Sequence, residues 1–111
     1  MKKFMVIYHA PAAAMEQMKD MSPEDMKKGM EPWTAWMEKC GSSLIDGGSP
    51  LAGGLKLTTG GSAPSDKEVA GYSILEAEDM QAAKAMLAGH PHLEWTPECS
   101  IEVHESFPME M

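Results

Sequence analysis

The segment that most constrains the fold is a continuous apolar run near the start of the chain. Residues 4–8 read FMVIY and lie between Lys2-Lys3 and Pro11. An apolar run of this length, bounded by charges and by a proline, predicts a buried strand. We therefore expect a central strand of a sheet here, with the other elements packed around it.

Helical patterns follow this strand. Helix propensity favours residues 12–20, and a second helix begins at Ser22-Pro23, where serine caps free N–H groups and proline fits the first position. Pro32 predicts a kink or break near residues 28–31 because it removes a backbone hydrogen bond. Gly41 is expected to end the helix in a left-handed conformation. Apolar residues at helical spacing predict one buried stripe: Met26, Met30, Trp33 and Met37.

The second half of the chain alternates between strand and helix patterns. The expected elements are short strands over 43–46 and 51–58, a polar loop over 59–66, a strand over 68–77, a helix over 79–88 and a strand over 99–104. Together with the N-terminal elements, this order gives a β-α-β-β-α-β arrangement. It predicts an α+β fold, a ferredoxin-like sandwich with a four-stranded antiparallel sheet.

One face of such a sheet is left without a cover. The predicted helices pack on one side, and the chain contains no further element for the other side. A second copy is the economical cover, so we expect a homodimer whose two sheets enclose a partly apolar space. A small-molecule ligand is expected to bind in that space.

Charge and composition exclude several classes of function. Lys and Arg number 9 against 17 Asp and Glu among 111 residues, a net charge of −8. So acidic a chain is a poor partner for nucleic acid or an anionic membrane surface. No apolar run approaches the roughly 20 residues of a membrane span. Two distant cysteines, Cys40 and Cys99, form no disulfide scaffold, so we expect a soluble cytoplasmic protein with reduced thiols.

Two residues at strand ends are candidates for catalysis. His9 follows the central strand, where an imidazole facing the cavity can move a proton near neutral pH; the alternative is a hydrogen-bonded histidine of structural use only. Asp46 ends a short strand before Gly47-Gly48. Its carboxylate can support a base in an apolar space, or it can serve only in an ordinary turn.

Aromatic residues and two further histidines are candidates for ligand binding. Trp33, Trp36 and Tyr72 can line a pocket for an apolar or planar ligand, although residues at helical spacing can equally form a plain core. His90 and His92 flank Pro91 just after a helix end. They form a metal site only if other ligands join them in space, and we assign no metal and no cofactor.

Longer stretches of sequence suggest a family. A strand runs into a helix that ends at Gly-His-Pro in AGYSILEAEDMQAAKAMLAGHP, and a strand follows as CSIEVHE. Nearer the N-terminus stand KKFMVIYHAP and CGSSLIDGGSPLAGG. In this order the stretches resemble the YCII-related domain family over nearly the whole chain. The resemblance implies one YCII-related domain over 1–111 and a dimeric α+β barrel.

The resemblance also bears on activity. Some relatives carry a histidine and an aspartate in the first helix region as a proposed acid–base pair, and they include a dehydrochlorinase. This chain has no histidine between His9 and His90, so that pair is absent. We therefore consider two hypotheses. The first is a small-molecule-binding dimer that acts as a lyase or isomerase, with proton transfer by His9 supported by Asp46. The second is a non-catalytic module for ligand sensing or protein interaction.

Overall fold

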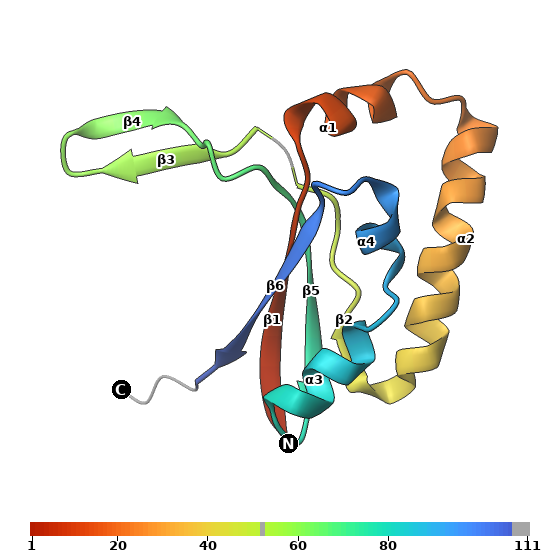
Figure 1. Ribbon diagram of the computed structural model, residues 1–111. Helices are drawn as coiled ribbons and strands as arrows, with labels where there is room; N and C mark the ends of the chain where they lie inside the picture. Colours follow the sequence, from red (N-terminus) through yellow and green to blue (C-terminus); the bar gives the residue numbers. More distant parts are fainter. Residues whose placement is uncertain (52, 108–111) are drawn as a thin grey trace.

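The computed structural model describes residues 1–51 and 53–107, and it shows an α+β fold with helices packed on one side of a sheet (Figure 1). The first half contains β1 (Lys2–His9), α1 (Ala12–Lys19), α2 (Pro23–Cys40), the 3-10 turn η1 (Gly41–Ser43), β2 (Leu44–Asp46) and β3 (Leu55–Thr58). The second half contains β4 (Gly61–Pro64), β5 (Val69–Ala77), α3 (Met80–Leu87), α4 (Pro91–Trp95) and β6 (Ser100–Ser106).

The main sheet has four strands in the order β2-β5-β1-β6, and every neighbouring pair is antiparallel. The N-terminal apolar run is therefore a central strand, hydrogen-bonded on both sides, as predicted. The α+β class and the four-stranded antiparallel sheet are confirmed as well. The strand order is compatible with a ferredoxin-like arrangement.

The two faces of the sheet differ in their cover. On β1, Phe4, Val6 and Tyr8 are buried and alternate with Met5, Ile7 and His9, which are exposed or half-buried. Val6 and Tyr8 pack under the helices in a core with Trp36, Leu75 and Leu87. Phe4 packs in another cluster with Ala77 and Ala83. Because side chains of a strand alternate between faces, the second set lies on the side without helices. We call that side the open face.

Helix α2 begins as expected, with the Ser22 hydroxyl accepting the Asp25 N–H at 3.2 Å. Of the kink or break predicted near residues 28–31, the break is wrong, because the helix continues without interruption to Cys40. Residues 28–32 are exposed, so water can bond the Lys28 carbonyl that proline leaves without its N–H partner. Gly41 ends the helix at a φ of 57° but a ψ of −131°, so the φ is left-handed while the standard helical cap is absent.

The apolar stripe of α2 is buried only in its second half. Trp33 and Met37 pack against the core, whereas Met26 and Met30 are 47% and 51% exposed. Trp36, outside the predicted stripe, is the buried residue of the helix, and its indole N–H donates to the Met86 carbonyl at 2.9 Å.

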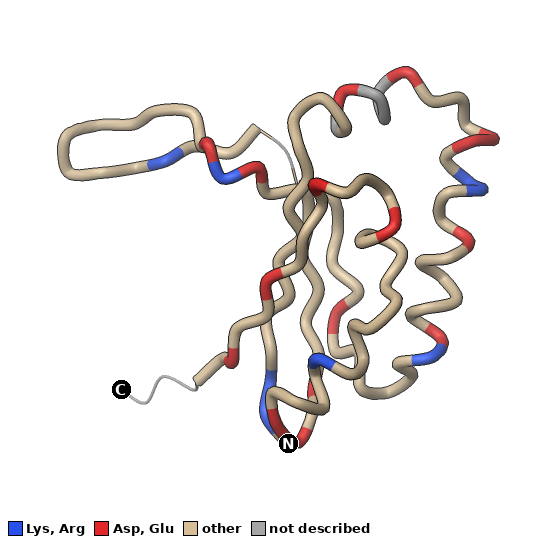
Figure 2. Tube along the Cα trace, viewed as in Figure 1, with Lys and Arg blue, Asp and Glu red and all other residues tan. Residues whose placement is uncertain are grey.

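The middle of the chain differs most from expectation. Residues 61–64 form a strand, β4, where a loop was predicted, and β4 pairs with β3 in a separate two-stranded sheet. This hairpin projects in the direction opposite to α2 (Figure 1). The predicted strand over 51–58 is therefore shorter and outside the main sheet, and its residue 52 lies outside the described residues. The hairpin carries Lys56 and no acidic residue (Figure 2).

A helix that crosses a membrane is about 20 residues long and predominantly apolar. Within residues 1–51 and 53–107, no helix is long and apolar enough to cross a membrane.

The unequal burial of α2 can be measured. Replacing Trp36 by alanine is expected to lower the free energy of unfolding by about 3–5 kcal/mol, because it removes a buried ring and leaves a cavity. Met30→Ala on the same helix is the matched control and is expected to change stability by less than about 0.5 kcal/mol. Urea-induced unfolding followed by circular dichroism gives both values. Equal losses would show that the whole stripe is buried in solution.

Candidate functional site

The open face carries a row of side chains from the middle of β1. Strand register places Ile7 between Tyr72 of β5 and Glu102 of β6, and Met5 between Ile74 and His104. His9 ends the same row, next to an irregularity in the β1–β5 pairing. The face is thus apolar on the β5 side and carries ionisable groups on the β6 side.

His9 is held at a defined tautomer on this face. Its Nδ1 lies 2.7 Å from the Lys67 carbonyl oxygen, which can only accept, so Nδ1 carries a proton. In the neutral ring the free lone pair is therefore on Nε2. That atom is buried without a hydrogen-bond partner of good geometry, although it lies 3.1 Å from Glu102 Oε2. When the ring is protonated, Nε2–H faces a carboxylate.

Glu102 stands between two imidazoles. Its Oε1 accepts from His104 Nε2 at 2.9 Å, and its Oε2 is the oxygen beside His9. The hydrogen bond from His104, followed by the charge of His9, holds the pKa of Glu102 below its usual range. Glu102 is therefore an anion at neutral pH and can stabilise positive charge on His9. Such a pair can accept a proton on the ring and keep the resulting imidazolium in place.

A second polar cluster lies on the opposite side of the sheet, under the helices. The Tyr8 hydroxyl is 2.8 Å from Ser73 Oγ and 3.2 Å from His90 Nε2. Ser73 donates to the Gly47 carbonyl at 3.0 Å. The side chains of Tyr8, Ser73 and His90 are all buried.

The direction of these hydrogen bonds is fixed. His90 Nδ1 accepts the backbone N–H of His92 at 3.0 Å, so the neutral ring carries its proton on Nε2 and donates to Tyr8. Since Ser73 donates to Gly47, the Tyr8 hydroxyl must donate to Ser73. The bonds run from His90 through Tyr8 and Ser73 to a backbone carbonyl, and each buried polar group has a partner.

Burial keeps the members of this cluster neutral. It lowers the pKa of His90 to about 4, with a smaller effect from His92, and it raises the pKa of Tyr8 to about 12. The pKa of His92 is also lowered by burial. His92 Nε2 donates to the His9 carbonyl at 2.7 Å, so it anchors β1 from below the open face.

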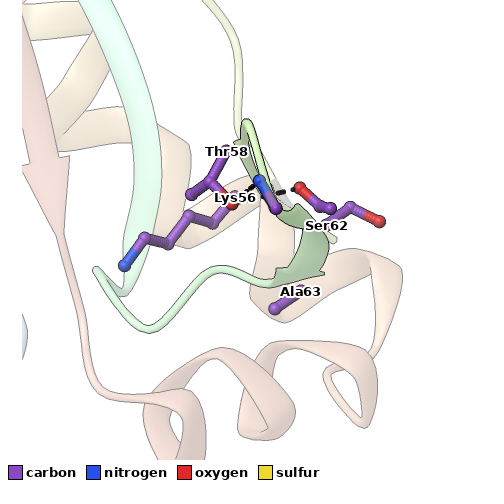
Figure 3. Close-up of a pocket in the computed structure, with 6 residues that line it drawn as sticks. Lys56, Thr58, Ser62 and Ala63 are labelled. Carbon is purple, nitrogen blue, oxygen red and sulfur yellow. Dashed lines mark hydrogen bonds between the residues drawn. The ribbon is translucent and has the colours of Figure 1, made fainter.

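Tryptophan side chains enclose His90. The rings of Trp33 and Trp36 lie 4.6 and 4.4 Å from the imidazole, centroid to centroid and edge-on. Two hollows in the described part of the chain lie away from this cluster. One of about 290 Å³ is on the hairpin around Lys56, Thr58 and Ser62 (Figure 3). The other, about 360 Å³, is on the outer side of α2 around Met30. Neither is lined by His9 or His90.

The structure therefore divides the predicted site residues between two places. His9 and Tyr72 lie on the open face, and the other aromatic and histidine candidates lie together under the helices: Trp33, Trp36, His90 and His92. Asp46 lies apart from His9, on the edge strand β2. Its Oδ1 accepts the Gly48 N–H at 2.8 Å in a turn, and its partner in β5 is Ile74, far along the sheet from His9.

The histidines also bear on metal binding. Within the part of the chain that the structure describes, no group of three or more His, Cys, Asp or Glu side chains is arranged to hold a metal ion. Both ring nitrogens of His90 are engaged in hydrogen bonds, which leaves no lone pair for a metal.

Glu102 and Ser73 were not among the predicted site residues. The alternation of Glu102 and His104 against Ile101 and Val103 was visible in the sequence. Only the antiparallel register of β6 against β1, however, brings Glu102 to His9. The role of Ser73 depends on a contact between residues distant in sequence, for which no local pattern exists.

No protein-family model matches this chain, and neither does any curated protein. The functional argument therefore depends on the fold and on side-chain geometry. These define an α+β domain with a tightly packed polar cluster under its helices and a histidine–carboxylate pair on its open face.

The depressed pKa of His90 predicts a pH-dependent stability. The unfolded chain takes up the His90 proton near pH 6.5, whereas the folded protein resists it until about pH 4. Stability is therefore full above pH 6.5 and falls as the pH drops towards 4, by about 2 kcal/mol between pH 7 and 5. His90→Asn retains a side-chain oxygen for the His92 N–H but cannot titrate. It should lose this part of the pH dependence in urea unfolding; an unchanged slope would contradict the assignment.

The hydrogen-bonded cluster predicts a difference between two tyrosines. Tyr8→Phe leaves the His90 Nε2–H without an acceptor and is expected to cost about 1–3 kcal/mol. Tyr72→Phe, on the open face of the neighbouring strand, is expected to cost less than about 0.5 kcal/mol. Thermal unfolding at pH 7 compares the two, and similar losses would show that the Tyr8 hydroxyl is not part of a satisfied network.

Proposed function

We propose that this protein is a YCII-like homodimer that binds a small organic molecule between two open sheet faces. It acts there as a lyase or isomerase by proton transfer, with His9 as the acid–base group. The observation that carries the proposal is the tautomer of His9. Lys67 holds Nδ1 at 2.7 Å, which directs the lone pair of Nε2 to the side of Glu102.

The homodimer follows from the uncovered sheet. Met5 is exposed on the open face, with Ile7, Tyr72 and Ile74 half-buried beside it. An apolar sheet face needs a second layer, and the helices lie on the other side. A two-fold dimer brings the same surface of two copies together. The resulting assembly is a ferredoxin-like dimeric α+β barrel, and its interior contains both copies of His9.

The proposed chemical step uses groups on this face. Nε2 of neutral His9 takes a proton from a carbon or oxygen of the substrate by way of the exposed Glu102 carboxylate, because Nε2 itself is buried and lies 3.1 Å from Glu102 Oε2. The Nδ1–H remains bonded to the Lys67 carbonyl, and the Glu102 carboxylate stabilises the imidazolium that forms. The same Nε2–H then returns the proton to another atom of the substrate or to a leaving group. Histidine suits this exchange near neutral pH.

The apolar half of the face sets the class of ligand. Ile7, Tyr72 and Ile74 favour a compact molecule with an apolar or planar part, while the His9 end favours a polar group. We therefore place the wall of the site at Tyr72. The ligand-binding roles of Trp33 and Trp36, of His90 and His92, and the supporting role of Asp46 stay predictions from sequence.

A non-catalytic module for ligand sensing or protein interaction is the second candidate. The observation that favours it is the filled space under the helices, where Trp33, Trp36 and Met37 pack against the core. The absence of a histidine in α2 also fits this candidate.

A substitution at His9 separates the two candidates. His9→Asn retains a side-chain N–H for the Lys67 carbonyl but removes the base. The assay measures exchange of carbon-bound hydrogen for deuterium in D₂O. Proton NMR follows the loss of C–H signals from a panel of small 2-oxo acids and unsaturated lactones. The wild type should accelerate the exchange, and His9→Asn should be slower by about 100-fold or more. Met30→Ala, on the outer side of α2, should exchange like the wild type.

Two results would count against the catalytic proposal. One is wild-type exchange no faster than buffer for every compound in the panel, which favours the non-catalytic module. The other is full activity in His9→Asn, which would place any acid–base group elsewhere.

A further inference from the structure

The hairpin is a feature that the proposed site does not use. We call residues 53–65 the arm; they contain β3, β4 and the turn between them. Among the described residues these strands pair only with each other, and the Ser65 N–H donates to the Gly54 carbonyl at 2.8 Å, which closes the base of the hairpin. A two-stranded hairpin that stands alone is at best marginally stable in water. This arm projects in the direction opposite to α2 (Figure 1).

One side of the arm is apolar and uncovered. Leu55 and Leu57 lie on the same side because they are two residues apart in a strand, and they are 67% and 75% exposed. Their cross-strand partners are Pro64 and Ser62, which are exposed as well. Large aliphatic side chains gathered at such exposure are typical of a surface that a partner covers.

The other side of the arm is polar and basic. Lys56 and Thr58 alternate with the leucines and border the hollow on the hairpin (Figure 3). Lys56 is the one charged residue between positions 53 and 65, whereas the whole chain has a net charge of −8 (Figure 2). The arm therefore has the opposite sign to the body of its own chain, and it suits a partner that combines apolar surface with acidic groups.

We propose that the arm clasps a second copy of this chain, packing Leu55 and Leu57 on that copy's apolar surface, while the positive charge of Lys56 is attracted by that copy's net negative charge. The body of an identical chain has the required chemistry: a net negative charge, and exposed apolar side chains outside the open face such as Ile45 of the edge strand β2 and Leu93 of α4. Two-fold symmetry supplies the contact twice, since each arm meets the other body. The inference rests on the homodimer of the proposed function and adds the arm as a second contact surface.

Sedimentation velocity of the full chain from about 1 to about 100 µM tests the clasp. The wild type should be a dimer. Leu55→Lys combined with Leu57→Lys should raise the dimer dissociation constant by about tenfold or more. Met26→Lys combined with Met30→Lys is the matched control: it makes the same change of charge at two exposed apolar residues of α2 and should leave the constant unchanged. Far-UV circular dichroism verifies that each variant is folded.

A third variant separates failure of the clasp from failure of the open-face dimer. Met5→Lys places a charge on the open face at an exposed position. If Met5→Lys dissociates and the arm variant does not, the clasp is overturned and the proposed dimer stands. If the arm variant dissociates and Met5→Lys does not, the clasp stands and the face-to-face dimer is overturned. A monomeric wild type over the whole range, or equal weakening in the α2 control, overturns the clasp as well.

Discussion

The central position of β1 is the constraint on which the rest of the structure depends. Because β1 is paired on both sides, its side chains can point only towards the helices or towards the open face. Tyr8 and His9 are neighbours in sequence but belong to different environments. Tyr8 enters a buried hydrogen-bonded network with Ser73, and His9 enters a half-buried site beside Glu102.

The two sides remain connected through the backbone. His92 lies under the helices, yet its Nε2–H bonds the carbonyl of His9. His90 in turn is fixed by the backbone N–H of His92. A polar cluster that would otherwise be costly to bury thereby serves to hold the end of β1, and with it the residue at the centre of the candidate site. This explains why two buried histidines need no ligand to account for their presence.

Local patterns in the sequence predicted what depends on local physics. The serine and proline at the start of α2, the alternation of β5 and the apolar run of β1 each determine a structure within a few residues. Predictions from the sequence failed where the structure depends on contacts with residues distant in the sequence. Residues 61–64 pair as a strand because β3 is opposite, not because glycine, serine and proline favour strands. Met26 and Met30 have helical spacing, but no other element covers them. Glu102 becomes a site residue only through strand register.

A single residue in the junction after the arm also shows that local sequence patterns cannot predict contacts between distant segments. Glu68 has a φ of 54°, a conformation that a residue other than glycine adopts at a cost of about 1 kcal/mol or more. Its carbonyl accepts the Ala10 N–H at 3.0 Å, and its carboxylate accepts the Ala12 N–H at 3.1 Å. These bonds to the segment after β1 compensate for the strain. They also set the preceding carbonyl, that of Lys67, against His9. The tautomer of His9 is thus determined by a backbone conformation that residues 66–69 do not favour by themselves. No sequence pattern within that segment could therefore have predicted this tautomer.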